Sequence, residues 1–443
     1  MKIGFVSLGC ARNVVDLEVM LGLLRERQHE LTLKPEKSDI LLINTCGFIR
    51  DAVEESLGVI LEAIDWKRKG KIQKIVVSGC LPQRYQGDLT RELGEVDVFL
   101  GSGEQNRIVE VIETLSQGME VPPAKWPAPR FLYSEESPRF PLTPPHTAFV
   151  KISEGCLNDC SFCIIPKIRG VYRERSIESI LEEVRRLAET GDLKEVNLIG
   201  QDTSLYGKRF YREQKLPELL RRLSCLNLVP WVRVLYLHPA HFTEELIDVF
   251  RTEKNICPYI DMPIQHASDS ILSSMKRECT QDQIRAILLG LREALPEFTL
   301  RTSVMVGYPG ETDRDFETLL QFIREIRFDR LGTFIFSREE KTDAYSLPNP
   351  VPLKLKQRRY EAVMALQKEI SRERLAQCIG QTLDALIEER DPKDPALWMG
   401  RSRGDAPEVD GQVFVRGKDL KVGEIIPVAI RDSYDYDLVG DAV

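Results

Sequence analysis

Residues 147–163 read TAFVKISEGCLNDCSFC and join an apolar, strand-like segment to a loop that is rich in cysteine. The three cysteines follow a CxxxCxxC pattern, at Cys156, Cys160 and Cys163. Their spacing of four and three residues also occurs on one face of a helix, but Gly155, Asn158 and Asp159 favour a loop. The IIPKIRG segment that follows would interrupt a long helix as well. We therefore expect three thiols gathered in one loop at the end of a buried strand.

Five further strand-like segments follow this loop, with helical patterns between them. The helical patterns, such as SIESILEEVRRLAETG and DRDFETLLQFIREI, carry apolar residues at three- and four-residue spacing. Six successive strand–helix units predict a partial (βα)6 barrel, in which functional groups gather at the carboxyl ends of the strands. The five segments are EVNLIGQ, WVRVLYLH, YIDMPIQH, TLRTSVMVGYP and RLGTFIFS.

Residues 1–118 also alternate between strand-like and helical segments. The strand-like segments are KIGFVSL, DILLINT, KIVVSG and VDVFLG, and helical patterns such as NVVDLEVMLGLLRER lie between them. This order predicts a separate N-terminal α/β domain, with a parallel sheet that is covered by helices on both faces.

Two changes in composition divide the rest of the chain. Residues 119–146 contain eight prolines, which neither helices nor central strands accommodate, so we expect an extended linker. The barrel domain then spans 147–375 and ends in a long helical stretch, LKLKQRRYEAVMALQKEISRERLAQ. From 379 to 443, short strand-like segments with turn signals predict a small antiparallel β-barrel.

Composition narrows the class of protein. The 443 residues are 29% charged and 42% hydrophobic, which is ordinary for a globular protein. No run of about 18 apolar residues occurs, and the chain begins on a strand-like segment without a signal sequence, so we expect a cytoplasmic protein with no membrane partner. The net charge of −8 argues against a protein that coats nucleic acid. Ten cysteines are too few for a disulfide scaffold, and clustered ones point to metal or redox chemistry.

A second set of cysteines, Cys10, Cys46 and Cys80, follows three strand-like segments of the N-terminal region. The intervals of 36 and 34 residues each match one βαβ unit, and such units return every strand in the same direction. The three thiols are therefore expected on one rim of the sheet, where open α/β sheets bind ligands. Three thiolates suit an iron–sulfur cluster with one iron left without a protein ligand, and zinc is the competing metal. Alternatively, the three cysteines are unrelated residues of the hydrophobic core and form no binding site.

The CxxxCxxC triplet indicates an iron–sulfur site more specifically than the three N-terminal cysteines do. A 4Fe–4S cluster normally takes four thiolates, so three leave one iron open to another ligand. At the start of a partial βα barrel, this triplet resembles that of the radical S-adenosylmethionine superfamily. The resemblance implies that the open iron binds the amino and carboxylate groups of S-adenosylmethionine. It also implies that one electron from the cluster cleaves the cofactor and releases a 5′-deoxyadenosyl radical.

Other barrel segments fit S-adenosylmethionine. The segment GQDTS follows the second barrel strand, so Gln201 and Asp202 are candidates to meet the methionyl amino group. The segment VGYPGET follows the fifth strand, where Gly307 and Gly310 permit close approach of the backbone to an adenosine. Phe162 lies between two of the cysteines and is a candidate to shield the adenine edge.

With both cysteine sets in place, the whole chain resembles the radical S-adenosylmethionine methylthiotransferases. That family has a three-cysteine N-terminal domain, a radical barrel and a small C-terminal barrel called TRAM. The segments SLGCARNVVDLEVM, NTCGFI, QDTSLYG, IQHAS and GRSRGDAPEVDG are similar to the branch that methylthiolates the β-carbon of an aspartate on ribosomal protein uS12.

The resemblance implies two 4Fe–4S clusters with different tasks. The cluster on Cys156, Cys160 and Cys163 would generate the radical. The cluster on Cys10, Cys46 and Cys80 would hold the sulfur or methylthio group on its open iron. S-adenosylmethionine would serve both as radical source and as methyl donor. The implied partners are uS12, free or in the small ribosomal subunit, an external electron donor and a sulfur donor.

The alternative substrate within the same architecture is a tRNA adenosine. Residues 380–443 contain fourteen acidic and eight basic residues. A barrel that grips RNA is expected to be basic, because phosphate contacts dominate affinity. An acidic module better suits a basic ribosomal protein, although an acidic surface can also serve solubility alone. The charge therefore favours uS12 over tRNA.

Two other classes of function compete with the methylthiotransferase. A non-catalytic carrier of iron–sulfur units would not need the GQDTS and VGYPGET segments, which this chain contains. A barrel enzyme with a zinc site at the N-terminal cysteines differs in its metal content, which iron and sulfide analysis would reveal.

Several residues receive a plain structural interpretation. His238 and His266 end strand-like segments, and either could line a substrate pocket or form a structural hydrogen bond. Asp16 and Glu18 come early in a predicted helix, where acidic side chains favour the helix dipole. The cysteines outside both sets are interpreted as packing or surface residues, and they are Cys225, Cys257, Cys279 and Cys378.

Overall fold

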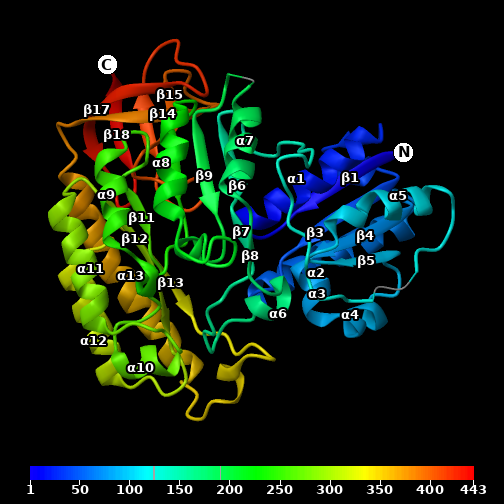
Figure 1. Cartoon of the computed structure of the whole chain (residues 1–443), viewed down its shortest axis with the longest axis horizontal. Helices are drawn as coiled ribbons and strands as arrows, with labels where there is room; N and C mark the ends of the chain where they lie inside the picture. The colour runs from blue at the N-terminus through cyan, green and yellow to red at the C-terminus, as the bar shows by residue number, and fades with distance from the viewer. Residues whose placement is uncertain (123–124, 190) are drawn as a thin grey trace.

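The computed structural model describes residues 1–122, 125–189 and 191–443. It has an N-terminal α/β domain, a partial parallel barrel and a small C-terminal β-barrel. In Figure 1 the N-terminal domain lies to the right of the partial barrel, and the C-terminal barrel lies above the partial barrel. This architecture confirms the fold class that the sequence predicted.

The N-terminal domain has a five-stranded parallel sheet in the order β2-β1-β3-β4-β5. All six residues of the central strand β3 are buried, because helices cover both faces. Ile40 and Leu42 pack under α1 and α5, whereas Leu41 and Ile43 pack under α2. The short edge strand β2 was not predicted. The elements are β1 (Lys2–Ser7), α1 (Ala11–Glu26), β2 (Glu30–Thr32), β3 (Ile40–Thr45), α2 (Arg50–Arg68), β4 (Lys74–Gly79), α3 (Cys80–Tyr85), α4 (Gly87–Glu92), β5 (Val98–Gly101) and α5 (Ile108–Ser116).

The partial barrel has six parallel strands in two three-stranded sheets, β10-β9-β6 and β11-β12-β13. A parallel bridge between Val232 and Ile256 joins the two sheets. Each strand coincides with a predicted segment. The strands are β6 (Thr147–Lys151), β9 (Glu195–Ile199), β10 (Trp231–Val234), β11 (Tyr259–Asp261), β12 (Thr299–Val306) and β13 (Arg330–Ile335).

Amphipathic helices cover the outside of this barrel and pack their apolar faces on the strands. A short antiparallel pair, β7 (Ser153–Glu154) and β8 (Arg173–Glu174), flanks the cysteine loop and α6 (Ile165–Arg169). The remaining helices are α7 (Ile177–Ala188), α8 (Leu216–Leu226), α9 (Glu244–Thr252), α10 (Asp269–Ser274), α11 (Gln281–Ala294), α12 (Asp313–Ile326) and α13 (Leu353–Ala376).

The C-terminal strands form a closed barrel in the order β14-β15-β16-β18-β17. Its pairings are antiparallel except for that between β16 and β18, which is parallel. The sequence predicted β14, β16 and β17 but not the short, glycine-containing strands β15 and β18. The strands are β14 (Thr382–Arg390), β15 (Leu397–Ser402), β16 (Val413–Arg416), β17 (Ile425–Ser433) and β18 (Leu438–Ala442).

This C-terminal barrel packs against the amino ends of the partial-barrel strands. Arg401 forms an ion pair of 2.6 Å with Glu195, the first residue of β9. Asp405 forms an ion pair of 2.5 Å with Arg330, the first residue of β13. The carboxyl ends of the strands, where such barrels hold their sites, therefore lie away from the C-terminal barrel.

The N-terminal domain contacts the partial barrel through α1, which is buried on both sides. Asp16 and Glu18 are buried in this contact, so their interpretation as dipole-favouring acids near the helix start is wrong. Asp16 bridges Lys151 of β6 and Arg169 of α6, each at 2.5 Å. Asp16 is therefore an ion-pair partner between the two domains, whereas Glu18 pairs with Arg139 of the proline-rich segment.

In the proline-rich segment, no helix or strand occurs in residues 119–122 or 125–146. The rest of the predicted linker, Pro123 and Ala124, lies outside the described residues. The segment packs along α1: Arg139 donates to Glu18 at 3.1 Å from Nε and to Glu183 of α7 at 2.6 Å from Nη1. The Phe140 amide donates to the Glu18 carbonyl at 3.0 Å. This segment thus fills the seam between the two domains.

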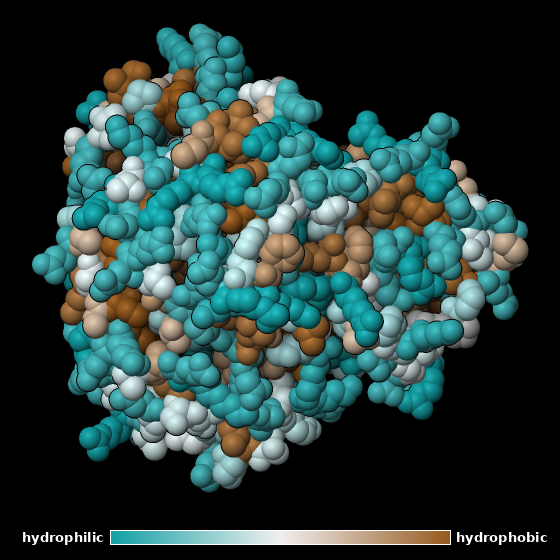
Figure 2. Space-filling view, viewed as in Figure 1, coloured by the Kyte–Doolittle hydropathy of each residue, from teal (hydrophilic) through white to brown (hydrophobic). Residues whose placement is uncertain are grey.

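Over the described part of the chain, no helix is both long enough and apolar enough to cross a membrane. Figure 2 shows a face that is mostly hydrophilic, with apolar side chains in separate small groups.

Replacement of Glu18 by alanine tests the contact between the domains. The variant leaves the buried Arg139 with one carboxylate fewer, and loss of one partner of a buried ion pair typically costs about 3–5 kcal/mol. Urea denaturation is expected to show that loss in the free energy of unfolding. Glu26→Ala, at the exposed end of the same helix, is the matched control and is expected to stay within about 0.5 kcal/mol of wild type. Equal stability of the two variants would contradict the buried contact.

Candidate active site

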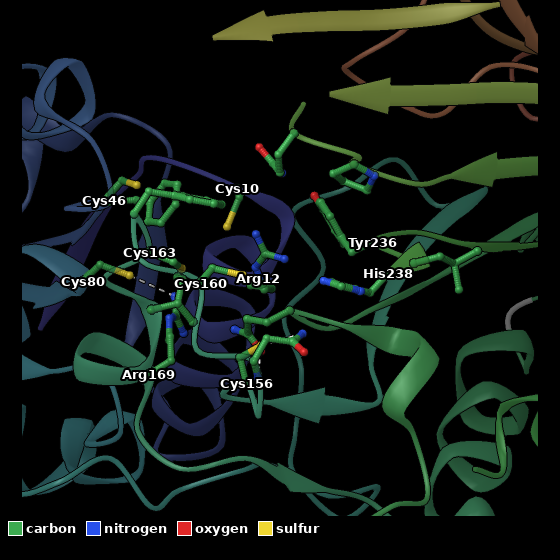
Figure 3. A pocket seen from close by; sticks show the side chains of 18 of the residues that line it. Cys10, Arg12, Cys46, Cys80, Cys156, Cys160, Cys163, Arg169, Tyr236 and His238 are labelled. Carbon is green, nitrogen blue, oxygen red and sulfur yellow. Dashed lines mark hydrogen bonds between the residues drawn. The ribbon is translucent and has the colours of Figure 1, made fainter. Parts of the chain in front are cut away.

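Both cysteine sets line one cavity of about 280 Å³ between the N-terminal domain and the partial barrel. Cys10, Cys46 and Cys80 follow β1, β3 and β4, which are neighbouring parallel strands. Their shared rim is therefore the one that the strand spacing predicted. Figure 3 shows these cysteines together with those of the barrel loop.

Backbone geometry brings the N-terminal thiols close together. Gly9 has a φ of +95°, a conformation that favours glycine. A Cβ atom at this position would lie 2.8 Å from Cβ of Cys46. Glycine before Cys10 therefore allows the ends of β1 and β3 to approach each other.

The barrel cysteines lie in a loop, as the sequence predicted, and not on a helix face. Ser161 anchors this loop, since its amide donates to the Met275 carbonyl at 3.1 Å and its hydroxyl to the Ser274 carbonyl at 2.9 Å. The amide N–H and the side-chain Nδ2 of Asn158 both donate to Sγ of Cys156 at 3.4 Å. The loop is thus ordered by contacts that leave the thiols facing the cavity.

Three arginines surround the thiols. Arg169 of α6 donates from Nη2 to Sγ of Cys80 at 3.2 Å, across the domain boundary. Arg277 donates to Sγ of Cys160 at 3.6 Å. Burial opposes ionisation of Cys10, but the positive charges of Arg12 and Arg169 outweigh it and lower the pKa of this thiol. These positive charges therefore favour negative charge on the sulfur of Cys10.

Burial raises the pKa of three further thiols: of Cys80 to about 12, of Cys163 to about 12 and of Cys156 to about 11. Such thiols ionise when a metal binds, because the metal replaces the proton. All ten cysteines of the chain are free of disulfides. Two sets of three thiols in one cavity fit two 4Fe–4S clusters, each with one iron that has no protein ligand.

Of the residues proposed to contact S-adenosylmethionine, Phe162 and Gln201 line the cavity. Nε2 of Gln201 donates to Glu154 at 2.5 Å, which fixes the amide at the cavity wall. Asp202 does not line the cavity. Its carboxylate accepts hydrogen bonds from Asn158 at 2.7 Å and from the Ser204 amide at 3.1 Å, and contacts Nδ1 of His241 at 3.0 Å. Asp202 therefore holds Asn158 in place from behind the wall.

Gly307 and Gly310 both have positive φ, of +75° and +84°, but neither lines the cavity. The Gly307 amide donates to Glu311, and a Cβ atom at Gly307 would collide with Lys356. These glycines form the turn after β12, and the described cavity does not reach them.

The two histidines differ. His238 lines the cavity, and burial together with the charge of Arg277 lowers its pKa to about 3, so its ring is neutral. Its Nδ1 accepts from the Ala240 amide at 3.2 Å. His266 is fully buried outside the cavity, and its Nδ1 accepts from the Ser268 amide at 2.9 Å. The remaining cysteines also lie outside the cavity: Cys225, Cys257, Cys279 and Cys378.

Sequence reasoning missed several residues of the cavity wall: Arg12, Arg169, Tyr236, Gln265 and Arg277. Arg12 and Arg169 lie close to cysteines in the sequence, and this proximity was the available signal. Tyr236 and Gln265 have positive φ, of 65° and 68°, a conformation that no composition pattern reveals. Non-glycine residues held in this region cluster at functional sites.

Comparison with known families agrees with this arrangement. Residues 150–323 match the Radical SAM superfamily, residues 2–101 match the uncharacterized protein family UPF0004, and residues 379–443 match the TRAM domain. Among solved structures, the radical S-adenosylmethionine methyltransferase TsrM from Kitasatospora setae, with cobalamin and a [4Fe-4S] cluster bound, shares the fold. Its TM-score is 0.58 at 15% identity, over 90% of this chain and 77% of that one.

Fold and site together define a radical S-adenosylmethionine enzyme with a TRAM domain. A Heliobacterium modesticaldum relative named ribosomal protein uS12 methylthiotransferase RimO is 46% identical over 100% of this chain and 95% of its own length. The same-named protein of Geobacter sulfurreducens is 43% identical over 100% and 98%. The chain belongs to the RimO family of methylthiotransferases. It is an enzyme that transfers a methylthio group, with 4Fe–4S clusters and S-adenosylmethionine as cofactors.

Proposed function

We propose that this enzyme methylthiolates the β-carbon of an aspartate on ribosomal protein uS12, with one 4Fe–4S cluster on each cysteine set. The observation that carries the proposal is the single cavity lined by all six cysteines. The names of the relatives support uS12 as the substrate. A domain division at 1–118, 119–146, 147–375 and 379–443 is part of the proposal.

The two sets divide the work. Cys156, Cys160 and Cys163 hold the radical-generating cluster, and Cys10, Cys46 and Cys80 hold the cluster that carries sulfur. When bound, the clusters and S-adenosylmethionine supply the 5′-deoxyadenosyl radical, the sulfur and the methyl group. The protein supplies ligation, orientation and a cavity that excludes water.

The cavity wall orients S-adenosylmethionine. Phe162 presents an aromatic face, and Gln201 presents an amide that Glu154 holds in place. Asp202 acts indirectly, because its hydrogen bond to Asn158 keeps that side chain against Cys156. Gly307 and Gly310 shape the neighbouring turn.

The count of acidic residues in the C-terminal barrel overstates the support for a basic protein substrate, because some of these residues are already paired. Three of its acids pair with cations outside that barrel: Asp405 with Arg330, Asp410 with Arg301 and Asp435 with Arg372. The barrel also lies at the far end of the partial barrel from the cysteines. Acidic residues still exceed basic ones, which favours a basic protein over tRNA. An external electron donor and a sulfur donor complete the set of partners.

The substrate is tested by competition. Reconstituted enzyme is offered uS12, free and in the small subunit, together with tRNA under anaerobic reducing conditions. Mass spectrometry is expected to find a methylthio group on an aspartate of uS12 and unmodified tRNA. A methylthioadenosine in the tRNA digest, with unmodified uS12, would overturn the proposed substrate.

The division of work is tested by two triple alanine variants. Removal of the barrel cysteines is expected to abolish reductive cleavage of S-adenosylmethionine, because the ligands of the radical-generating cluster are lost. Removal of Cys10, Cys46 and Cys80 is expected to leave release of 5′-deoxyadenosine intact and to abolish methylthiolation.

Iron analysis and circular dichroism are the controls, since cluster binding contributes to domain stability. Each variant is expected to keep about four of about eight irons. Stoichiometric zinc at the N-terminal cysteines would favour the zinc alternative. A folded N-terminal variant that cleaves no cofactor would show that the two sets do not act separately.

A further inference from the structure

Arg12, the second residue of α1, lines the cavity from the N-terminal domain and extends to the partial barrel. Its Nη1 donates to the Gly200 carbonyl, just beyond β9, at 2.6 Å. Figure 3 shows the Arg12 side chain between Cys10 and the pair Cys156 and Cys160. The guanidinium therefore lies in the cavity that both cysteine sets line.

The three arginines of the cavity differ in their partners. Arg169 forms ion pairs with Asp16 at 2.5 Å and with Glu154 at 3.4 Å. Arg277 donates hydrogen bonds to the Pro263 carbonyl at 2.7 Å and to Sγ of Cys160. Among the described residues, Arg12 forms no ion pair with a carboxylate, and its charge faces the Gly200 carbonyl and the Cys10 thiol. Because no carboxylate neutralises it, and a guanidinium has five N–H donors, Arg12 can still bind an anionic ligand.

The orientation of the Arg12 side chain is fixed before any ligand binds. Its Cζ lies 4.4 Å from the centre of the Tyr236 ring. Tyr236 has a φ of 65°, and hydrogen bonds of 3.0 Å hold it there: its amide donates to Asp261, and its carbonyl accepts from the Thr203 amide. A strained residue that supports a guanidinium fits a site that binds a ligand in one geometry.

We infer that Arg12 binds the side-chain carboxylate of the substrate aspartate. This inference rests on the proposed function, because it takes the β-carbon of an aspartate as the reacting atom. The carboxylate carbon is bonded directly to that β-carbon, so a guanidinium that holds both oxygens also fixes the β-carbon. Arg12 is thus a positioning residue that presents the β-carbon between the two cysteine sets.

The test combines two enzymes with two peptides. Wild-type enzyme and Arg12→Gln, both reconstituted, bind a labelled peptide that spans the modified aspartate, or the same peptide with asparagine there. Fluorescence anisotropy without reductant reports binding and not turnover. Wild type is expected to bind the aspartate peptide about 10- to 100-fold more tightly, the range for a hydrogen-bonded charged group. Arg12→Gln is expected to reduce this ratio to less than about threefold.

Arg27→Gln is the matched control, since it removes an equal charge at the exposed far end of α1. It is expected to keep the wild-type ratio. If Arg12→Gln loses iron from the N-terminal cysteines, Arg12→Lys replaces it, because lysine keeps the charge but lacks the two-pronged geometry. In Arg12→Lys, the preference for the aspartate peptide over the asparagine peptide is then expected to fall about tenfold.

The experiment distinguishes failure of the Arg12 inference from failure of the proposed function. An unchanged preference for aspartate in the Arg12 variant that retains its iron would overturn the role of Arg12. Wild-type enzyme that neither binds nor modifies the aspartate peptide would instead overturn the proposed function, and the inference with it.

Discussion

The buried contact of α1 with the partial barrel is the constraint on which the site depends. Asp16 is held between Lys151 and Arg169, and Glu18 is held by Arg139. Charged groups buried in this way are stable only with their partners in place, so the contact allows one register between the two domains. In that register the carboxyl edge of the N-terminal sheet faces the carboxyl ends of the partial-barrel strands. A cavity with three cysteines on each side follows from this arrangement.

The same contact sets the electrostatics of the cavity. Arg169 belongs to the partial barrel, yet it donates to Cys80 of the N-terminal domain and pairs with Asp16 in the same place. Arg12 belongs to the N-terminal domain, yet it donates to Gly200 of the partial barrel. Each domain thus contributes positive charge beside the thiols of the site. The C-terminal barrel covers the amino ends of the partial-barrel strands. The cavity therefore lies at the other end, at the boundary with the N-terminal domain.

The sequence predicted the features that arise from local pattern. Strand periodicity placed Cys10, Cys46 and Cys80 on one rim, and loop-forming residues placed Cys156, Cys160 and Cys163 after β6. Features that arise from packing between domains were not predictable. Asp16 and Glu18 look like surface acids because their partners are more than 100 residues away in sequence. Asp202 likewise looks free until Asn158 and His241 occupy its oxygens. The turn around Gly307 is explained by Lys356, which belongs to the distant α13.

Both cysteine sets open into one cavity, and we therefore claim that the two clusters lie close together. Electron paramagnetic resonance of the reconstituted enzyme, with both clusters reduced, tests this claim most directly. We expect magnetic interaction between the clusters, seen as broadening or splitting that is absent from either triple cysteine variant. A wild-type spectrum equal to the sum of the two variant spectra would contradict the shared cavity.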